Sequence, residues 1–177
     1  RDGKKEIGGL MLTACLEYLL EDENTEVIIV IGKPPCEEVQ KKLWELISHS
    51  SKPVIANFLI PMQVPELPNL YYVRSLSETA FFACKKAGIE VKTAKLAEDF
   101  PLPKLRGPYL RGLYSGGTLC HEAIQVYLDN FGCEPFNNVT DQAFFRLTDG
   151  WQTKENSIID LGADEYNYIK EDYLNLK

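Results

Sequence analysis

Stretches with apolar residues at helical spacing alternate along the chain with short, continuous apolar runs, which predicts helices alternating with buried strands. Helices are expected over residues 9–20, 36–48, 75–87 and 119–130, and strands over residues 27–31, 54–60, 70–73, 110–114 and 157–161. The turn-rich stretches 61–68 and 132–138 are expected to be loops. Strands joined by crossover helices pair in parallel, so the predicted fold is α/β with a doubly wound, mostly parallel sheet.

Several of these elements carry finer signals. The β-branched run 27–31 is typical of a strand buried on both faces of a sheet. The third helix is expected to begin with a capping box at Ser75 or Ser77 and to stop at Gly88. His49 lies near the end of the second helix, where it is expected to interact with the negative end of the dipole. The apolar face of the first helix is predicted to consist of Leu10, Met11, Ala14, Cys15, Tyr18 and Leu19.

The sequence Ser115-Gly116-Gly117-Thr118 forms the corner between the strand at 110–114 and the helix that follows. Glycines at such a corner let a ligand approach the backbone, and the first unpaired N–H groups of a helix attract anions. Ser115 and Thr118 are candidates to cap this helix or to donate hydroxyl hydrogen bonds. The corner therefore predicts either a phosphate-binding cradle, made by Ser115, Gly116, Gly117, Thr118 and Leu119, or a tight turn with a capped helix.

A wider stretch around this corner, RGLYSGGTLCHEA from Arg111 to Ala123, resembles the turn that opens the ligase domain of succinyl-CoA synthetase. It is most similar to the FdrA family, whose members show R-G-L-Y-S-G-G-T-L-C-[DH]-E-A. Residues 7–11 with 27–35, and residues 157–165, also resemble this family and occur in its order. The resemblance implies a flavodoxin-like, ligase-type domain that is repeated along the chain of a succinyl-CoA-synthetase-related protein.

One part of the succinyl-CoA synthetase pattern is missing. In that family the loop corresponding to residues 61–68 leads to a G-H-A-G-A stretch whose histidine carries a phosphoryl group. Here no histidine lies between His49 and His121. A phosphohistidine step is therefore not expected in this half of the chain, and the FdrA pattern shares this absence.

Three residues that follow the corner carry side chains that could take part in chemistry. His121 either lines a bound anion or lies on the solvated face, and the Asp that the FdrA pattern allows there argues against a phospho-acceptor. Cys120 lies near the helix start, which can lower a thiol pKa, but its apolar neighbours favour a buried structural thiol. Glu122 is a candidate general base, with a structural role favoured. The pair Gly8-Gly9 before the first helix is interpreted as a turn.

The composition limits the possible partners. The net charge is −7 without a cluster of Lys and Arg, which argues against nucleic acid. No apolar run reaches the length of a membrane helix, and no Cys or His cluster indicates a metal. The five cysteines are odd in number, widely spaced and mostly within apolar runs, which is typical of buried thiols in a reducing cytoplasm, so a cytoplasmic location is expected.

The repeat interpretation sets the expected domain organisation. Residues 1–93 would be the back half of one ligase-like repeat, 94–108 a proline-containing linker, and 109–177 the front half of the next, either separate or joined in one composite domain. The start at Arg1 without an initiator Met suggests a piece of a longer protein. The resemblance implies a CoA-binding-like domain and further subunits elsewhere.

The sequence is compatible with three functions. The resemblance implies CoA or carbamoyl phosphate as ligand, and thus part of an acid-thiol ligase or of a transferase. The first candidate is an acyl-CoA synthetase subunit whose phosphohistidine is supplied elsewhere. The second is an oxamate carbamoyltransferase-like subunit, which the missing histidine favours because that chemistry mainly requires a phosphate cradle. The third is a non-catalytic scaffold.

Overall fold

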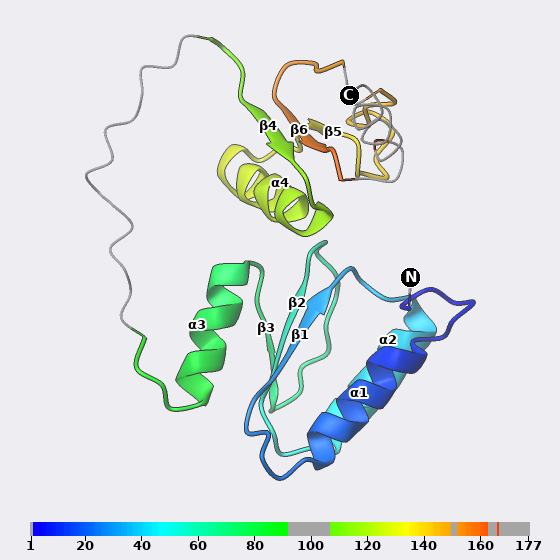
Figure 1. Ribbon diagram of the computed structural model, residues 1–177, viewed down its shortest axis with the longest axis vertical. Helices are drawn as coiled ribbons and strands as arrows, with labels where there is room; N and C mark the ends of the chain where they lie inside the picture. Colours follow the sequence, from blue (N-terminus) through cyan, green and yellow to red (C-terminus); the bar gives the residue numbers. More distant parts are fainter. Residues whose placement is uncertain (1, 92–106, 150–151, 163–165, 167–177) are drawn as a thin grey trace, which may run out of the picture. The chain divides into compact units, whose positions relative to one another are not determined.

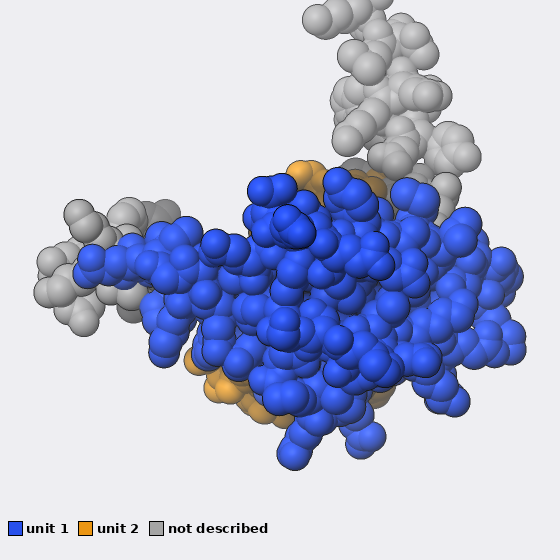
Figure 2. All heavy atoms as spheres, turned by 90° about the horizontal axis from the view of Figure 1, so that it is seen from below, with its two compact units in different colours: residues 1–96 blue, residues 97–177 orange. Residues whose placement is uncertain are grey.

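The computed structural model describes residues 2–91, 107–149, 152–162 and 166. The chain divides into two compact units, Arg1–Leu96 and Ala97–Lys177, which Figure 2 draws in blue and orange. Each described unit is an α/β structure built on a three-stranded parallel sheet, so the predicted fold class is confirmed. Most of the expected linker, residues 94–106, lies outside the described residues, and the repeat interpretation stays a prediction.

The described residues of the first unit form three helices and three strands (Figure 1). Its sheet has the order β1-β2-β3, so β2 is central. The helices are α1 (Leu10–Glu21), α2 (Glu37–Ser48) and α3 (Leu76–Lys86), and the strands are β1 (Ile28–Gly32), β2 (Val54–Phe58) and β3 (Leu70–Tyr72). Every residue of β2 is buried, because helices cover the sheet on both faces.

Two core clusters show how these faces are covered. Leu16 of α1 and Leu43 of α2 pack with Val54 of β2 on one face. Ala83 of α3 packs with Ile55, the next residue of β2, on the other face. Neighbouring strand residues point to opposite faces, so this arrangement is a doubly wound sheet, with α3 on the side opposite α1 and α2 (Figure 1).

Predicted helix boundaries in the first unit agree with the structure. The capping box forms at Ser75, whose side chain accepts a hydrogen bond from the Glu78 amide while Glu78 reaches back. Gly88 follows α3 with a φ of +68°, which suits a glycine stop. The ring Nδ1 of His49 lies 2.8 Å from the Glu45 carbonyl oxygen in the last turn of α2, which confirms its expected place at that helix end.

Two burial predictions for the first unit are wrong. In α1 the predicted apolar face is largely exposed, including Leu10, Met11 and Tyr18, whereas Leu16 is buried and Leu12, Leu19 and Leu20 pack beside it. The helix carries two apolar stripes, and only one packs on the sheet. In β1, Ile29 and Ile31 are about half exposed because β1 is an edge strand of the described sheet, and α3, the helix on that face, packs mainly on the central strand β2.

The second unit is a smaller parallel sheet with the order β4-β6-β5 and one described long helix. Its elements are β4 (Arg111–Tyr114), α4 (Gly117–Phe131), β5 (Phe136–Asn137) and β6 (Ser157–Asp160). Cys120, Ile124 and Tyr127 of α4 pack against Ile158 of the central strand β6. The two-residue strand β5 lies where the sequence predicted only a loop.

Burial in the second unit differs from the prediction at two apolar positions. Leu113 of β4 is 65% exposed, because β4 is an edge strand of this sheet, so the expectation of a buried strand is wrong there. Leu119, the apolar residue at which the predicted helix 119–130 begins, is also exposed. Among the described residues, no helix combines the length and apolar character needed to cross a membrane.

Candidate functional site

The corner between β4 and α4 is open to solvent. Gly116 is the N-cap residue of α4 in an extended conformation, and Ser115 and Thr118 on either side of the glycine pair are exposed. Since the cap falls on a glycine and no side-chain cap bond forms, the prediction that Ser115 or Thr118 caps the helix is wrong. Both hydroxyls face solvent in a position where they could donate to a ligand.

The first amides of α4 keep their hydrogen-bonding capacity within the described chain. The first hydrogen bond of the helix runs from the Cys120 amide to the Gly116 carbonyl oxygen, over 3.1 Å. The amides of Gly116, Gly117, Thr118 and Leu119 donate to no acceptor among the described residues. These N–H groups form the positive end of the α4 dipole, so this end can accept an anion.

The first turn of α1 provides a contrast within the same chain. There, the carboxylate of Asp2 accepts hydrogen bonds from the amides of Met11 and Leu12, over 3.2 and 2.8 Å. The preceding Gly9 is the N-cap residue with a φ of +71°. The Gly8-Gly9 segment is thus a turn, as predicted. The Asp2 carboxylate already accepts hydrogen bonds from the first turn of the helix that follows this turn.

A carboxylate also lies beside the α4 corner, but it accepts no hydrogen bond from the first amides of α4 among the described residues. Asp160, the last residue of β6, is 6% exposed, and its Oδ1 accepts the amide of Gly162 over 2.9 Å. A Cβ atom built on Gly117 would lie 3.1 Å from Asp160 Oδ2. Asp160 Oδ2 therefore points at the glycine that begins α4, and no described residue donates a hydrogen bond to it.

Asn138 holds Asp160 in this position. Its side-chain nitrogen donates to the Asp160 carbonyl oxygen, and its side-chain oxygen accepts the Asp160 amide, both over 2.9 Å. The Asn138 side chain thus joins the residue after β5 to the last residue of β6, two residues beyond Ile158, where the backbone pairing of the two strands ends. Because Asn138 and Asp160 are both buried, these two bonds fix the Asp160 backbone firmly.

The ends of β4 and β6 meet at the corner. A Cβ atom built on Gly162 would lie 2.6 Å from the Ser115 carbonyl oxygen, so only glycine permits this approach. The Leu161 amide donates to the Tyr114 carbonyl oxygen and joins the two strand ends. The carboxyl ends of parallel strands are where open α/β sheets place their ligands, and the corner lies at that edge.

The three candidate residues after the corner lie in the first two turns of α4. Cys120 is fully buried in the core beside Ile158, as expected for a structural thiol. His121 is 5% exposed, so the expectation of a solvated surface position is wrong, while the alternative of lining a site stays a prediction. Glu122 is half-buried. None of these facts assigns a chemical role to the three residues.

The burial expected for the other cysteines is not found. Cys15 and Cys133 are exposed, Cys36 and Cys84 are half-buried, and none of the five cysteines forms a disulfide in the structure. The described residues contain no group of three or more His, Cys, Asp and Glu side chains arranged to hold a metal ion.

The sequence reasoning singled out neither Asp160 nor Asn138. Asp160 ends a short apolar run, Ser157-Ile158-Ile159, and is followed two residues later by Gly162. An acidic residue directly after a predicted parallel strand, with a glycine beside it, was the available signal. Asn138 gave no such signal, because its role depends on a two-residue strand that the sequence does not reveal.

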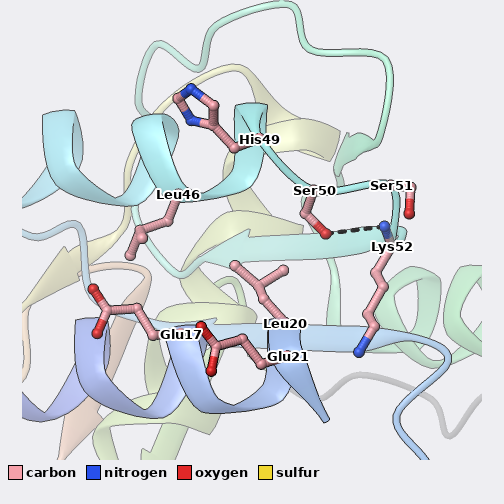
Figure 3. Close-up of a pocket in the computed structure, with 8 residues that line it drawn as sticks. All are labelled: Glu17, Leu20, Glu21, Leu46, His49, Ser50, Ser51 and Lys52. Atoms are coloured by element: carbon pink, nitrogen blue, oxygen red, sulfur yellow. Dashed lines mark hydrogen bonds between the residues drawn. The ribbon is translucent and has the colours of Figure 1, made fainter. Parts of the chain in front are cut away.

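A separate hollow of about 330 Å³ lies in the first unit (Figure 3). It is bounded by the C-terminal ends of α1 and α2 and by the segment that leads into β2. Lys52 lines this hollow and donates from Nζ to the carbonyl oxygens of Leu19 and Asp22, over 3.0 and 2.6 Å. These bonds satisfy carbonyl groups at the end of α1, so Lys52 serves as a helix cap. The other residues that line the hollow are Glu17, Leu20, Glu21, Leu46, His49, Ser50 and Ser51.

Comparison with known proteins identifies a bacterial relative of this chain. The chain is similar to the uncharacterized protein YahF of Escherichia coli (strain K12), with 30% identity over 181 residues. The match covers 94% of this chain, and the chain spans about a third (34%) of the length of that relative. No family model matches the chain.

Proposed function

We propose that this chain is part of an FdrA-like, succinyl-CoA-synthetase-related subunit that binds a phosphate group at the β4-α4 corner and takes part in carbamoyl or acyl transfer. Two observations support the family. The stretch RGLYSGGTLCHEA resembles the FdrA pattern, and the similarity to YahF extends over nearly the whole chain. The CoA-binding-like domain and the partner subunits belong to this proposal as parts of the longer protein.

The observation that carries the phosphate site is the set of amides at Gly116, Gly117, Thr118 and Leu119. These groups lie at a solvent-exposed corner and donate to no acceptor among the described residues. A phosphate group bound there would accept several backbone hydrogen bonds at the positive end of a 15-residue helix. Backbone amides suit this acidic chain, whose net charge of −7 would not attract an anion by itself.

Carbamoyl transfer is the reaction that this site supports best. When the acceptor nitrogen forms a bond to the carbamoyl carbon, the bond from that carbon to the phosphate oxygen breaks and negative charge collects on the departing phosphate, which can take up the proton that the acceptor nitrogen loses. Amides already aimed at that phosphate stabilise the charge without reorganisation. This chemistry requires no phosphohistidine, and residues 50–120 contain no histidine.

Two alternatives lead to different outcomes in the same assays. An acyl-CoA synthetase subunit would use a phosphohistidine from another part of the protein. A scaffold that has lost the chemistry is favoured by one observation, since the Asp160 carboxylate beside Gly117 can itself interact with the α4 dipole.

The experiment uses the full-length protein with its partner subunits. Phosphate released from carbamoyl phosphate in the presence of oxamate identifies the transferase, whereas protein labelling by ATP or succinyl phosphate identifies the synthetase. Neither product would form with a scaffold. A Gly117→Val variant should lose the phosphate release, because the added side chain meets Asp160 and covers the amides. Unchanged phosphate release in that variant would show that the β4-α4 corner takes no part in the reaction.

A further inference from the structure

The charge of Asp160 conflicts with phosphate binding at the same corner. Its Oδ2 faces Gly117, whose amide begins the set that would hold the phosphate. Asp160 cannot turn away easily, since Oδ1 holds the Gly162 amide and the backbone is bonded on both sides to Asn138. A phosphate at the α4 amides would therefore lie beside a fixed carboxylate, and like charges at short range repel.

A divalent cation removes this conflict. Mg²⁺ is commonly bound by one or two carboxylates together with substrate phosphate oxygens, and it keeps several water ligands. Such a site needs no dedicated cluster of acidic residues, and the described residues contain none. Asp160, a residue that is only 6% exposed and whose Oδ2 faces Gly117 at an anion-binding helix end, supplies the protein part of this arrangement.

We propose that phosphate binds at the β4-α4 corner together with a divalent cation of the Mg²⁺ class, and that Asp160 Oδ2 is the protein ligand of this cation. The inference rests on the proposed phosphate site and adds its cofactor. The α4 amides bind one set of phosphate oxygens, and the cation bridges another phosphate oxygen to Asp160. The carboxylate then promotes binding of the metal-phosphate complex and opposes binding of phosphate alone.

The test is equilibrium dialysis of labelled inorganic phosphate against the 177-residue chain, with Mg²⁺ or with EDTA. We expect Mg²⁺ to tighten phosphate binding by about tenfold or more, within the range common for two coupled ligands. Coupling is reciprocal, so phosphate must tighten the binding of Mn²⁺, measured by water proton relaxation, by the same factor by which Mn²⁺ tightens phosphate binding.

The decisive variant is Asp160→Asn, which keeps an acceptor for the Gly162 amide and removes the charge. It should bind phosphate without Mg²⁺ at least as well as the native chain, and Mg²⁺ should change its affinity by less than about twofold. The matched control is Glu155→Gln, which removes one exposed charge before β6, at the opposite end of the strand. This control should keep the native response to Mg²⁺, and circular dichroism confirms that both variants are folded.

The results separate the two proposals. Phosphate binding by the native chain that is equally tight with Mg²⁺ and with EDTA would overturn the cation site and leave the phosphate site standing. A response to Mg²⁺ that persists in Asp160→Asn would also overturn the role of Asp160. If neither the native chain nor Asp160→Asn binds phosphate under either condition, the proposed phosphate site itself is wrong.

Discussion

Gly162 and the Ser115 carbonyl are in such close contact that the end of β6 touches the beginning of the corner. A Cβ atom on Gly162 would lie 2.6 Å from Ser115 O and 2.8 Å from the carbonyl carbon. Both neighbours are backbone atoms, so they cannot rotate away as a side-chain tip would. This contact joins Asp160 and the α4 amides in one rigid edge of the second unit.

Gly162→Ala should therefore destabilise the chain, by about 1–3 kcal/mol, because the added methyl forces a backbone shift. Urea unfolding followed by circular dichroism measures this loss. Gly107→Ala is the matched control, since a Cβ atom there meets nothing within 4 Å, and it should be nearly neutral. Equal stability of the two variants would show that the space between Gly162 and the Ser115 carbonyl can hold a methyl group.

Gly117→Val should abolish phosphate binding with only a small loss of stability, about 1 kcal/mol. Its Cβ atom would press on Asp160 Oδ2 at 3.1 Å, and its methyl groups would obstruct the first amides of α4. Calorimetric titration with inorganic phosphate in the presence of Mg²⁺ is the measurement, and Gly107→Val is the control. Native phosphate affinity in Gly117→Val would exclude the corner as the binding site.

The reactivity of the cysteines should follow their burial. Cys15 and Cys133 are exposed and should react first with a thiol reagent, whereas Cys120 is fully buried and should react only after unfolding. Peptide mapping after timed labelling, with and without denaturant, identifies the modified residues. Early labelling of Cys120 in the folded chain would contradict its place in the core beside Ile158.

The pKa of Asp22 should lie below its ordinary value of 3.8, mainly because the Thr25 hydroxyl donates to its carboxylate over 2.6 Å. A carboxyl group with a lowered pKa in the folded chain stabilises the fold above the pKa of the unfolded chain. This contribution is lost as the pH falls through the lower, folded value. Thr25→Val should raise the pKa of Asp22, measured by carbon NMR titration, and an unchanged value would exclude this hydrogen bond as the main cause.

Most elements of the fold could be predicted from the sequence because apolar periodicity and turn residues agree there. The long helices α2, α3 and α4 each combine helical spacing with a recognisable beginning or end. The packed face of α1 could not be predicted, since Leu12 and Leu16 form a second apolar stripe beside Leu10 and Met11. Periodicity shows that stripes exist but not which one meets the sheet.

The sequence predicts the glycine corner of the candidate site but not the carboxylate of Asp160 beside it. The glycine corner is local in sequence, so its open amides could be expected from residues 115–119 alone. The carboxylate of Asp160 comes from a strand about 40 residues further on, and only the parallel pairing of β4 with β6 brings it to the corner. Side-chain pairing by Asn138 then fixes its position.

The central claim is that main-chain amides at the start of α4 hold a phosphate group. Nitrogen-proton NMR of the chain, titrated with inorganic phosphate in the presence of Mg²⁺, tests it most directly. The account predicts that the largest shifts occur at the amides of Gly116, Gly117, Thr118 and Leu119, while those of Met11 and Leu12, which Asp2 already engages, stay unchanged. Unshifted corner amides at saturating phosphate would contradict the account.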